Sequence, residues 1–250
     1  MRRGKDPSIL ILCYSKLEGV FIRIFDLIRL IPLRLQRIIW HFGHLFVSVW
    51  KRPKRLLDFQ ENLAWSVELL CYLLDLIGVG EVYETICDFV KFNSRPLHRN
   101  EIDAVQQIFG KSFPTRRIRL DEYAFLGPRT HHFAYVSFCT INHWGALSPE
   151  LFIHEMVHVW QYHKLGSVYI PRALRAQFSE EGYNYGGLAN LVLAIRSGRG
   201  IRHFNLEQQG DILADYSRIR QGKNPRWGGV TSDDLWVYEH IVEDMKEAAV

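Results

Sequence analysis

Apolar residues recur at steps of three and four through residues 16–50, which is the spacing of one face of an α-helix. Because proline lacks a backbone N–H, we expect Pro32 to interrupt this helix. The longest uncharged run, Ile38 to Trp50, has 13 residues and is too short to span a bilayer. The pattern therefore predicts two basic amphipathic helices. Their apolar positions are Leu17, Val20, Phe21, Ile24, Phe25 and Ile28, then Leu35, Ile38, Ile39, Phe42, Leu45, Phe46 and Val49.

Residues 57–92 are strongly apolar and also helical in spacing. The glycines of Gly78-Val79-Gly80 divide them into two helices, so we expect a helical hairpin that covers the rest of the chain. Asn93-Ser94-Arg95-Pro96 has the composition of a linker. The sequence therefore predicts a helical, basic N-terminal region over residues 1–94 and a second domain over residues 95–250.

The second domain alternates between helical and strand-like patterns. Its expected elements are a helix over residues 98–109, strands over 117–120 and 132–142, and helices after Ser148, over 188–195, after Asn205 and over 233–250. This mixture predicts an α+β fold that is mostly helical and contains a small β-sheet. A hydrophobic content of 48% in 250 residues supports a sizeable core.

The charge is unevenly distributed along the chain. Residues 1–60 hold 12 Lys and Arg against 4 Asp and Glu, whereas the other 190 residues hold 19 against 23. A basic arm favours anionic membranes, nucleic acid or acidic proteins. Here the basic residues are interleaved with aliphatic ones, as in an amphipathic helix, so we expect no nucleic acid partner. Residues 16–55 fit a membrane surface or a protein partner, and packing against the rest of the chain stays an open alternative.

Two further features concern the compartment. The four cysteines, Cys13, Cys71, Cys87 and Cys139, lack the spacing of a metal or redox motif and indicate reduced thiols. Residues 2–13 imitate a signal peptide, but the apolar run is too short. We therefore expect synthesis in the cytoplasm without a signal peptide.

The strongest chemical signal is His154-Glu155-Met156-Val157-His158. Histidines four residues apart lie on one face of a helix, where both imidazoles can bind the same metal ion. A glutamate beside the first histidine can take a proton from water at the open metal position. Ser148 as N-cap, Pro149 in the first turn and Gly166 at the end delimit the helix. The alternative is a structural helix with two incidental histidines.

A catalytic zinc site needs a third protein ligand, and the downstream helix offers carboxylates. Glu207, Asp211 and Asp215 follow one another at intervals of four along one face, after the expected N-cap Asn205. Carboxylates directed toward an apolar side are costly unless a positive group meets them, and a metal–histidine cluster is such a group. A solvated acidic face is the alternative. His163 lies five residues after His158 and points to a different face.

The segments FIHEMVHVWQ and FNLEQQGDILADY resemble a family of small bacterial gluzincin-like zinc metallopeptidases. Those domains are often fused to VgrG or Rhs proteins or encoded near them, and some act as toxins of type VI secretion systems. RPLHRNEIDAVQQIFG and RRIRLDE are similar to the opening helix and first strand of the family. The resemblance covers about residues 95–220 and leaves out the first 90 residues.

This resemblance implies a zincin-like fold with the sheet beside the HExxH helix, and Zn²⁺ held by His154, His158 and Glu207. It implies Glu155 as general base. Asp215, or less favourably Asp211, would accept a hydrogen bond from a ligand histidine and fix its tautomer. By analogy with such enzymes, the segment Thr140–Trp144 is expected to form part of the substrate wall. Tyr183 is a candidate donor to the oxyanion that forms during hydrolysis.

We therefore expect a zinc metalloendopeptidase acting on a peptide, a protein or a cell-wall peptide. The family resemblance adds an antibacterial effector role, export by a contact-dependent secretion system, and a secretion-machinery partner for residues 16–55. Peripheral membrane association is the other expectation for that segment. The rival from another class is a non-catalytic zinc-binding module that recruits a membrane or partner.

Overall fold

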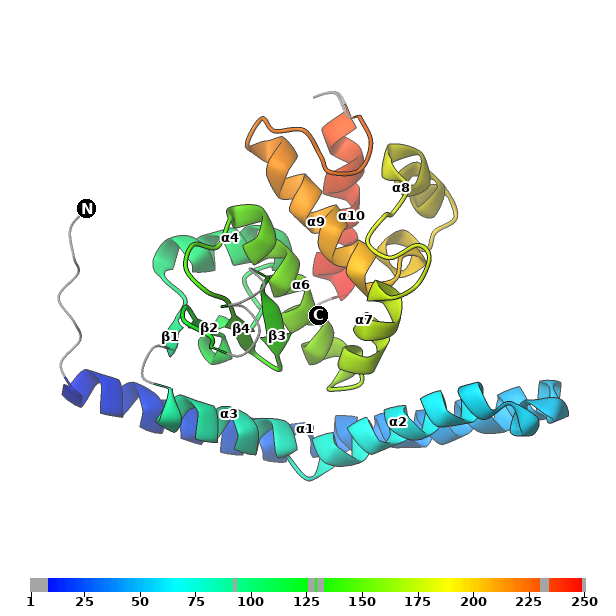
Figure 1. Ribbon diagram of the computed structural model, residues 1–250, viewed down its shortest axis with the longest axis horizontal. Coiled ribbons are helices and arrows are strands. Elements are labelled where there is room, and N and C mark those ends of the chain that lie inside the picture. Colours follow the sequence, from blue (N-terminus) through cyan, green and yellow to red (C-terminus); the bar gives the residue numbers. More distant parts are fainter. Residues whose placement is uncertain (1–8, 92–93, 126–128, 130–132, 230–233, 249–250) are drawn as a thin grey trace. The chain divides into compact units, whose positions relative to one another are not determined.

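The computed structural model describes residues 9–91, 94–125, 129, 133–229 and 234–248 (Figure 1). Within them the chain is mostly helical and carries one small mixed sheet of four strands, which confirms the predicted α+β class. The chain divides into two compact units, residues 1–94 and 95–250. Most of the signal-like segment, the first residue of the predicted strand 132–142 and the last two residues of the tail lie outside the described residues.

The first unit is built on one long helix, α1 (Ile9–Lys51), of 43 residues. The predicted interruption at Pro32 is wrong, because the helix continues through it. Pro32 and Ile28 are both exposed, so the Ile28 carbonyl that loses its usual backbone donor lies on the outer side of the helix. Contacts of α1 with other helices on both sides of the proline hold the two halves in one helix.

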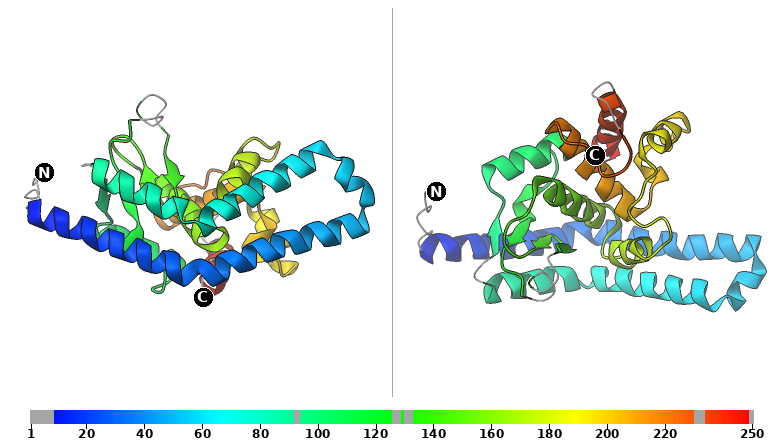
Figure 2. Two further views of the ribbon diagram at one scale, coloured as in Figure 1. Left: turned by 90° about the horizontal axis from the view of Figure 1, so that it is seen from below. Right: turned by 45° about the horizontal axis from the view of Figure 1, so that its top comes forward.

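Helices α2 (Phe59–Leu76) and α3 (Val79–Val90) follow a short turn, η1 (Pro53–Leu57), and both run along α1 in the opposite direction (Figure 2). The break between them is at Gly78, as predicted. The hairpin, however, is made by α1 with α2 and α3, while α2 and α3 follow one another at a bend of 64°. Gly78 has φ 78°, and a Cβ there would lie 2.7 Å from Leu27, so this close turn requires glycine.

Charged side chains occupy the contact between α1 and its two partner helices. Arg23 Nη1 lies 2.7 Å from Asp88 Oδ2, and Arg34 Nη2 lies 2.5 Å from Glu81 Oε1. Arg34 also donates to the backbone oxygen of Asp75.

Taken one at a time, the described helices lack the length and low charge that a membrane crossing needs. Only the bent pair α2–α3, taken together, passes that test.

The sheet of the second unit has the strand order β1-β2-β4-β3. Its strands are β1 (Ser94–Pro96), β2 (Arg119–Asp121), β3 (Tyr135–Ser137) and β4 (Thr140–Asn142). β2 is parallel to β4, which pairs antiparallel with β3. The single strand predicted over residues 132–142 is wrong, because the chain reverses at Phe138, whose φ is 57°, and forms the hairpin β3–β4. β2 starts later than predicted, after the short turn η2 (Thr115–Arg117).

The described second unit also contains six helices, of which α6 packs against strands β3 and β4. They are α4 (Arg99–Phe109), α6 (Pro149–Leu165), α7 (Tyr169–Gln177), α8 (Gly187–Arg196), α9 (Leu206–Arg220) and α10 (Leu235–Ala248), with the short turn η3 (Gly200–His203) before α9. α6 packs along α9 at the centre and is buried from Phe152 to Tyr162 (Figure 1). The core around them includes Ile141, Met156, Val157, Ile212, Leu213, Tyr238 and Ile241.

An ion pair ties the first turn of α6 to the segment after α9. Lys223 Nζ lies 2.5 Å from Glu150 Oε1, and the Glu150 carboxylate is buried while Lys223 is half exposed. The hydrogen bond from Lys223 outweighs the effect of burial and lowers the pKa of Glu150 to about 2. This carboxylate therefore stabilises the fold above its pKa in the unfolded chain, and the contribution is lost as the pH falls toward 2.

We expect Lys223→Ala to lower the free energy of unfolding by about 1 kcal/mol at pH 7, because the pair is partly exposed. The difference from wild type should shrink at pH 3, where the unfolded carboxyl is already protonated. Urea unfolding at the two pH values measures both differences. Lys246→Ala, which removes only a surface pair with exposed Glu243, is the control. An equal loss at both pH values would contradict this account of Glu150.

Candidate metal centre

The site lies between α6 and the first turns of α9, whose starts are fixed by side-chain caps. Ser148 Oγ accepts a hydrogen bond from the Leu151 backbone N–H at 3.2 Å, as the sequence predicts. Asn205 caps α9, since its Oδ1 accepts a hydrogen bond from the Gln208 backbone N–H at 2.9 Å. In return, Gln208 Oε1 accepts a hydrogen bond from the Asn205 backbone N–H at 3.0 Å. Both helices therefore begin at defined residues, which sets the rotation of their buried faces.

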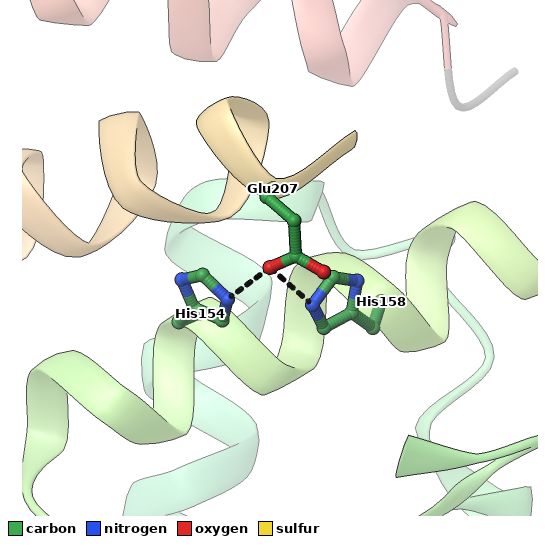
Figure 3. A group of neighbouring side chains, drawn as sticks. All are labelled: His154, His158 and Glu207. Atoms are coloured by element: carbon green, nitrogen blue, oxygen red, sulfur yellow. Dashed lines mark ion pairs between the residues drawn. The ribbon is translucent and has the colours of Figure 1, made fainter. Parts of the chain in front are cut away.

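Three side chains converge between these helices (Figure 3). His154 and His158 extend from α6, and Glu207 reaches down from α9. Glu207 Oε2 lies 3.3 Å from His154 Nε2 and 3.5 Å from His158 Nε2. All three residues are buried, and their potential ligand atoms lie within 4.8 Å of one another. Among the described residues this is the group that could hold a metal ion.

The second nitrogen of each histidine has a partner that fixes the ring. His154 Nδ1 lies 3.0 Å from Asp211 Oδ1, and His158 Nδ1 lies 2.8 Å from Gln161 Oε1. Because both partner atoms are acceptors, each Nδ1 carries the proton and donates it. Each Nε2 faces Glu207 and is the nitrogen that would bind a metal ion in place of a proton.

These two partners are themselves held in place. Asp211 Oδ2 accepts from Trp227 Nε1 at 2.6 Å and from Arg226 Nη1 at 3.2 Å. Gln161 Nε2 donates to the Leu206 backbone oxygen at 2.8 Å and to Gln209 Oε1 at 3.0 Å. Hydrogen bonds thus connect side chains of α6 and α9 around the histidines. The packing of the two helices therefore fixes the orientation of both imidazole rings.

The preference for Asp215 as the partner of a ligand histidine is wrong. Its carboxylate accepts from the Tyr185 hydroxyl at 2.8 Å and from the backbone N–H groups of Arg226 and Trp227 at 2.6 and 3.2 Å. Asp215 therefore anchors the segment after α9, and Asp211, one turn nearer Glu207, lies beside His154. The interpretation of Glu207, Asp211 and Asp215 as a solvated acidic face is also excluded, because all three are buried.

The electrostatics of the group favour a positive charge at its centre. Burial alone lowers the pKa of His154, but the hydrogen bonds with Asp211 and Glu207 outweigh it and raise this pKa to about 10. Burial alone raises the pKa of Glu207, but the two histidines outweigh it and lower this pKa to about 2. Two imidazole nitrogens and a carboxylate oxygen fit a divalent transition metal. A tetrahedral ion with such bonds separates its ligand atoms by roughly 3.3 Å. The Glu207 oxygen lies 3.3 and 3.5 Å from the two histidine nitrogens.

Glu155 differs from the other carboxylates of the site. Its side chain is buried, and within the described part of the chain its Oε2 has no hydrogen-bond partner. Burial raises the pKa of this carboxyl. Glu155 also lines the same cleft as the three converging residues, so a proton acceptor stands beside the metal position.

The cleft has a volume of about 380 Å³ and is lined by the metal residues, by β3 with the residues before it, and by α7. Tyr183 faces it, with its ring centroid 5.8 Å from that of His154, and burial raises the pKa of its phenol. The expectation that Thr140–Trp144 forms the wall is wrong, because β4 is buried in the middle of the sheet. The strand at the cleft is the edge strand β3.

Sequence reasoning missed two residues that shape the site. Gln161, three residues after His158 in the segment HVWQ, holds that histidine, and its one-turn spacing was a usable signal. Gly210 lies in α9 opposite His154, and an added Cβ would lie 2.6 to 2.9 Å from three atoms of the imidazole ring. His163 stays outside the group, as predicted, and its ring packs on Phe113.

Comparison with curated proteins relates part of this chain to a secretion component. The chain is similar to the type VI secretion system spike protein VgrG2b of Pseudomonas aeruginosa, with 29% identity over 135 residues. The match covers 49% of this chain and 13% of that protein, so the chain spans a small part of the length of its relative. No protein-family model and no solved structure matches the chain.

We expect Gly210→Ala to weaken metal binding at least about 10-fold, because the new methyl group displaces the His154 ring from Asp211 and Glu207. Isothermal titration of the metal-free protein with Zn²⁺ measures this. Gly43→Ala is the matched control, since Gly43 is also inside a helix but has no atom within 4 Å of an added Cβ. Unchanged affinity in Gly210→Ala would contradict the close approach of α9 to His154.

Proposed function

We propose that the chain is a zinc-dependent metallopeptidase that hydrolyses peptide bonds. The observation that carries the proposal is the convergence of His154 Nε2, His158 Nε2 and Glu207 Oε2 at the wall of an open cleft, with Glu155 beside them. Two imidazoles and one carboxylate make up the protein ligands of many catalytic zinc sites. A structural zinc is closed by a fourth protein ligand, whereas the described group offers three.

Zinc bound at this site would supply a Lewis acid that polarises the scissile carbonyl and acidifies water. The chain's own residues would do the remaining work. Glu155 would accept the proton of the attacking water and pass it to the leaving amine, a role that its burial and its raised pKa support. The Tyr183 hydroxyl, kept protonated by its raised pKa, would donate a hydrogen bond to the developing oxyanion.

The cleft supports an extended peptide as substrate. β3 is an edge strand beside the metal residues, and an edge strand can pair with the backbone of a bound peptide. The opposite wall is largely apolar and includes Ile170, Ala173, Leu174 and Phe178. We therefore expect cleavage next to an apolar side chain. Proteins and cell-wall peptides both present a backbone of this kind.

The similarity to a VgrG spike protein supports a role in type VI secretion. VgrG2b is by its name a spike protein of that system, and about half of this chain is similar to a part of it. We propose that the present chain acts as an antibacterial effector, is exported by contact-dependent secretion, and associates with the secretion machinery. Hydrolysis inside a recipient cell would be the toxic step.

The metal assignment is tested first by elemental analysis of zinc in the purified wild type and in Glu207→Ala. About one zinc per chain is expected in the wild type and a large loss in the variant, because a two-histidine site holds zinc weakly. Glu239→Ala, which changes an exposed glutamate on α10, should retain the wild-type content. A wild type without zinc, purified without chelator, would exclude the proposal.

Glu155→Gln tests the reaction. The amide is nearly isosteric, and Glu155 is not one of the three converging residues, so the variant should keep its zinc. It cannot accept a proton, so turnover of labelled casein and of cell-wall peptides should fall at least about 100-fold. Glu180→Gln, an exposed glutamate, should leave turnover unchanged. Wild-type turnover in Glu155→Gln would contradict the role of Glu155.

A further inference from the structure

Along α2 and α3 of the first unit, apolar side chains are exposed and charged side chains are not. From Leu63 to Val90, along α2 and α3, the exposed positions are apolar or aromatic except for Ser66. The exposed apolar side chains are Leu63, Val67, Leu70, Leu73, Ile77, Val79, Val82, Tyr83, Ile86, Phe89 and Val90. This outer surface therefore lacks the charged residues that normally cover a water-facing helix.

The acidic residues of the same stretch lie away from this exposed surface. Glu68, Asp75, Glu81, Glu84 and Asp88 are buried or half buried. Three of them, one on α2 and two on α3, pair with a basic side chain of α1. The pairs are Arg23 with Asp88, Arg34 with Glu81, and His41 with Glu68, whose nitrogen and oxygen atoms lie 2.7, 2.5 and 3.9 Å apart.

The facing part of α1 is similar, with Gln36 and His44 as its exposed polar side chains. Between Leu30 and Trp50 no charged side chain is exposed, because Arg34 is 4% exposed and Arg37 is half buried. The exposed apolar residues in this part are Ile31, Leu33, Leu35, Ile39, Trp40, Phe42, Phe46, Val47 and Trp50. The apolar surface thus belongs to both arms of the hairpin.

This distribution fits lipid better than water or a single protein face. In a bilayer, charged side chains face the interior of a helix bundle and pair with one another, while apolar side chains face the acyl chains. The exposed apolar residues lie along both arms of the hairpin and end at a basic turn, an arrangement that suits acyl chains and anionic headgroups together. An apolar area of this extent marks an interaction surface.

The length of the apolar part of α1 and the charge at the tip of the hairpin agree with a lipid bilayer. The 21 residues from Leu30 to Trp50 span about 32 Å as a helix, close to the roughly 30 Å of a bilayer core. The turn at the end of the hairpin carries Lys51, Arg52, Lys54 and Arg55. Basic residues at that position complement anionic lipid headgroups, and Trp50 beside them suits the interface.

We propose that the hairpin formed by α1 with α2 and α3 inserts into an anionic lipid bilayer, with its apolar outer side against the acyl chains and the cluster Lys51–Arg55 at the headgroups. The charges that keep α1 from qualifying as a membrane helix by itself are held in the contact with α2 and α3. The proposal uses no residue of the metal centre and stands whether or not the chain is a peptidase.

The test is flotation of the full chain with vesicles of phosphatidylcholine alone or mixed with phosphatidylglycerol. Binding is expected mainly to the anionic vesicles, with quenching of tryptophan fluorescence by brominated acyl chains. Leu70→Glu should reduce binding at least about 10-fold, because it places a charge against the acyl chains. Leu193→Glu in α8 is the matched control, since the two leucines are 55% and 53% exposed.

A double variant separates the attraction to headgroups from insertion into the acyl chains. Arg52→Ala together with Lys54→Ala should weaken binding to anionic vesicles about 10-fold or more and reduce its salt dependence. Circular dichroism checks that each variant keeps its helix content. Three results would overturn the proposal: no vesicle binding, binding without quenching by brominated lipid, or a dimer in solution that Leu70→Glu dissociates while vesicles stay unbound.

Discussion

A buried imidazole can offer one nitrogen to a metal only if its other nitrogen is satisfied. In this chain that requirement is met for both histidines by groups that lie between α6 and α9. Asp211 comes from α9 itself, while Gln161 comes from α6 and is braced by α9 through Leu206 and Gln209. The geometry of the site therefore depends on how the two helices pack. The caps at Ser148 and Asn205 contribute by fixing the residue at which each helix begins.

The sequence was most informative where the answer depends on local spacing. The α+β class, the caps and the convergence of His154 and His158 follow from helix periodicity and from residues that prefer helix ends. It was less informative where two distant segments meet. Whether Pro32 ends a helix depends on what packs on either side of it, and whether residues 132–142 run straight depends on the reversal at Phe138.

The choice between Asp211 and Asp215 shows both limits. In a helix, Asp215 lies about 12 Å beyond Glu207 along the axis, twice as far as Asp211, so helix geometry alone already disfavoured it. What the sequence could not supply is the other use of Asp215, which holds Tyr185 and the backbone after α9. Tyr185 in turn meets Tyr238 of α10, with 2.8 Å between their hydroxyl oxygens. Asp211 thus orients a histidine of the site, whereas Asp215 holds together parts of the fold.

The indole N–H of Trp227 donates to the Asp211 carboxylate, which orients His154. The backbone N–H of Trp227 donates to the Asp215 carboxylate. A single carboxylate, that of Asp211, therefore connects the indole to the imidazole of His154. A positive ion held by His154 would change the charge near the indole, and tryptophan fluorescence would then report its binding. The chemical shift of that indole proton would record the same event by nuclear magnetic resonance.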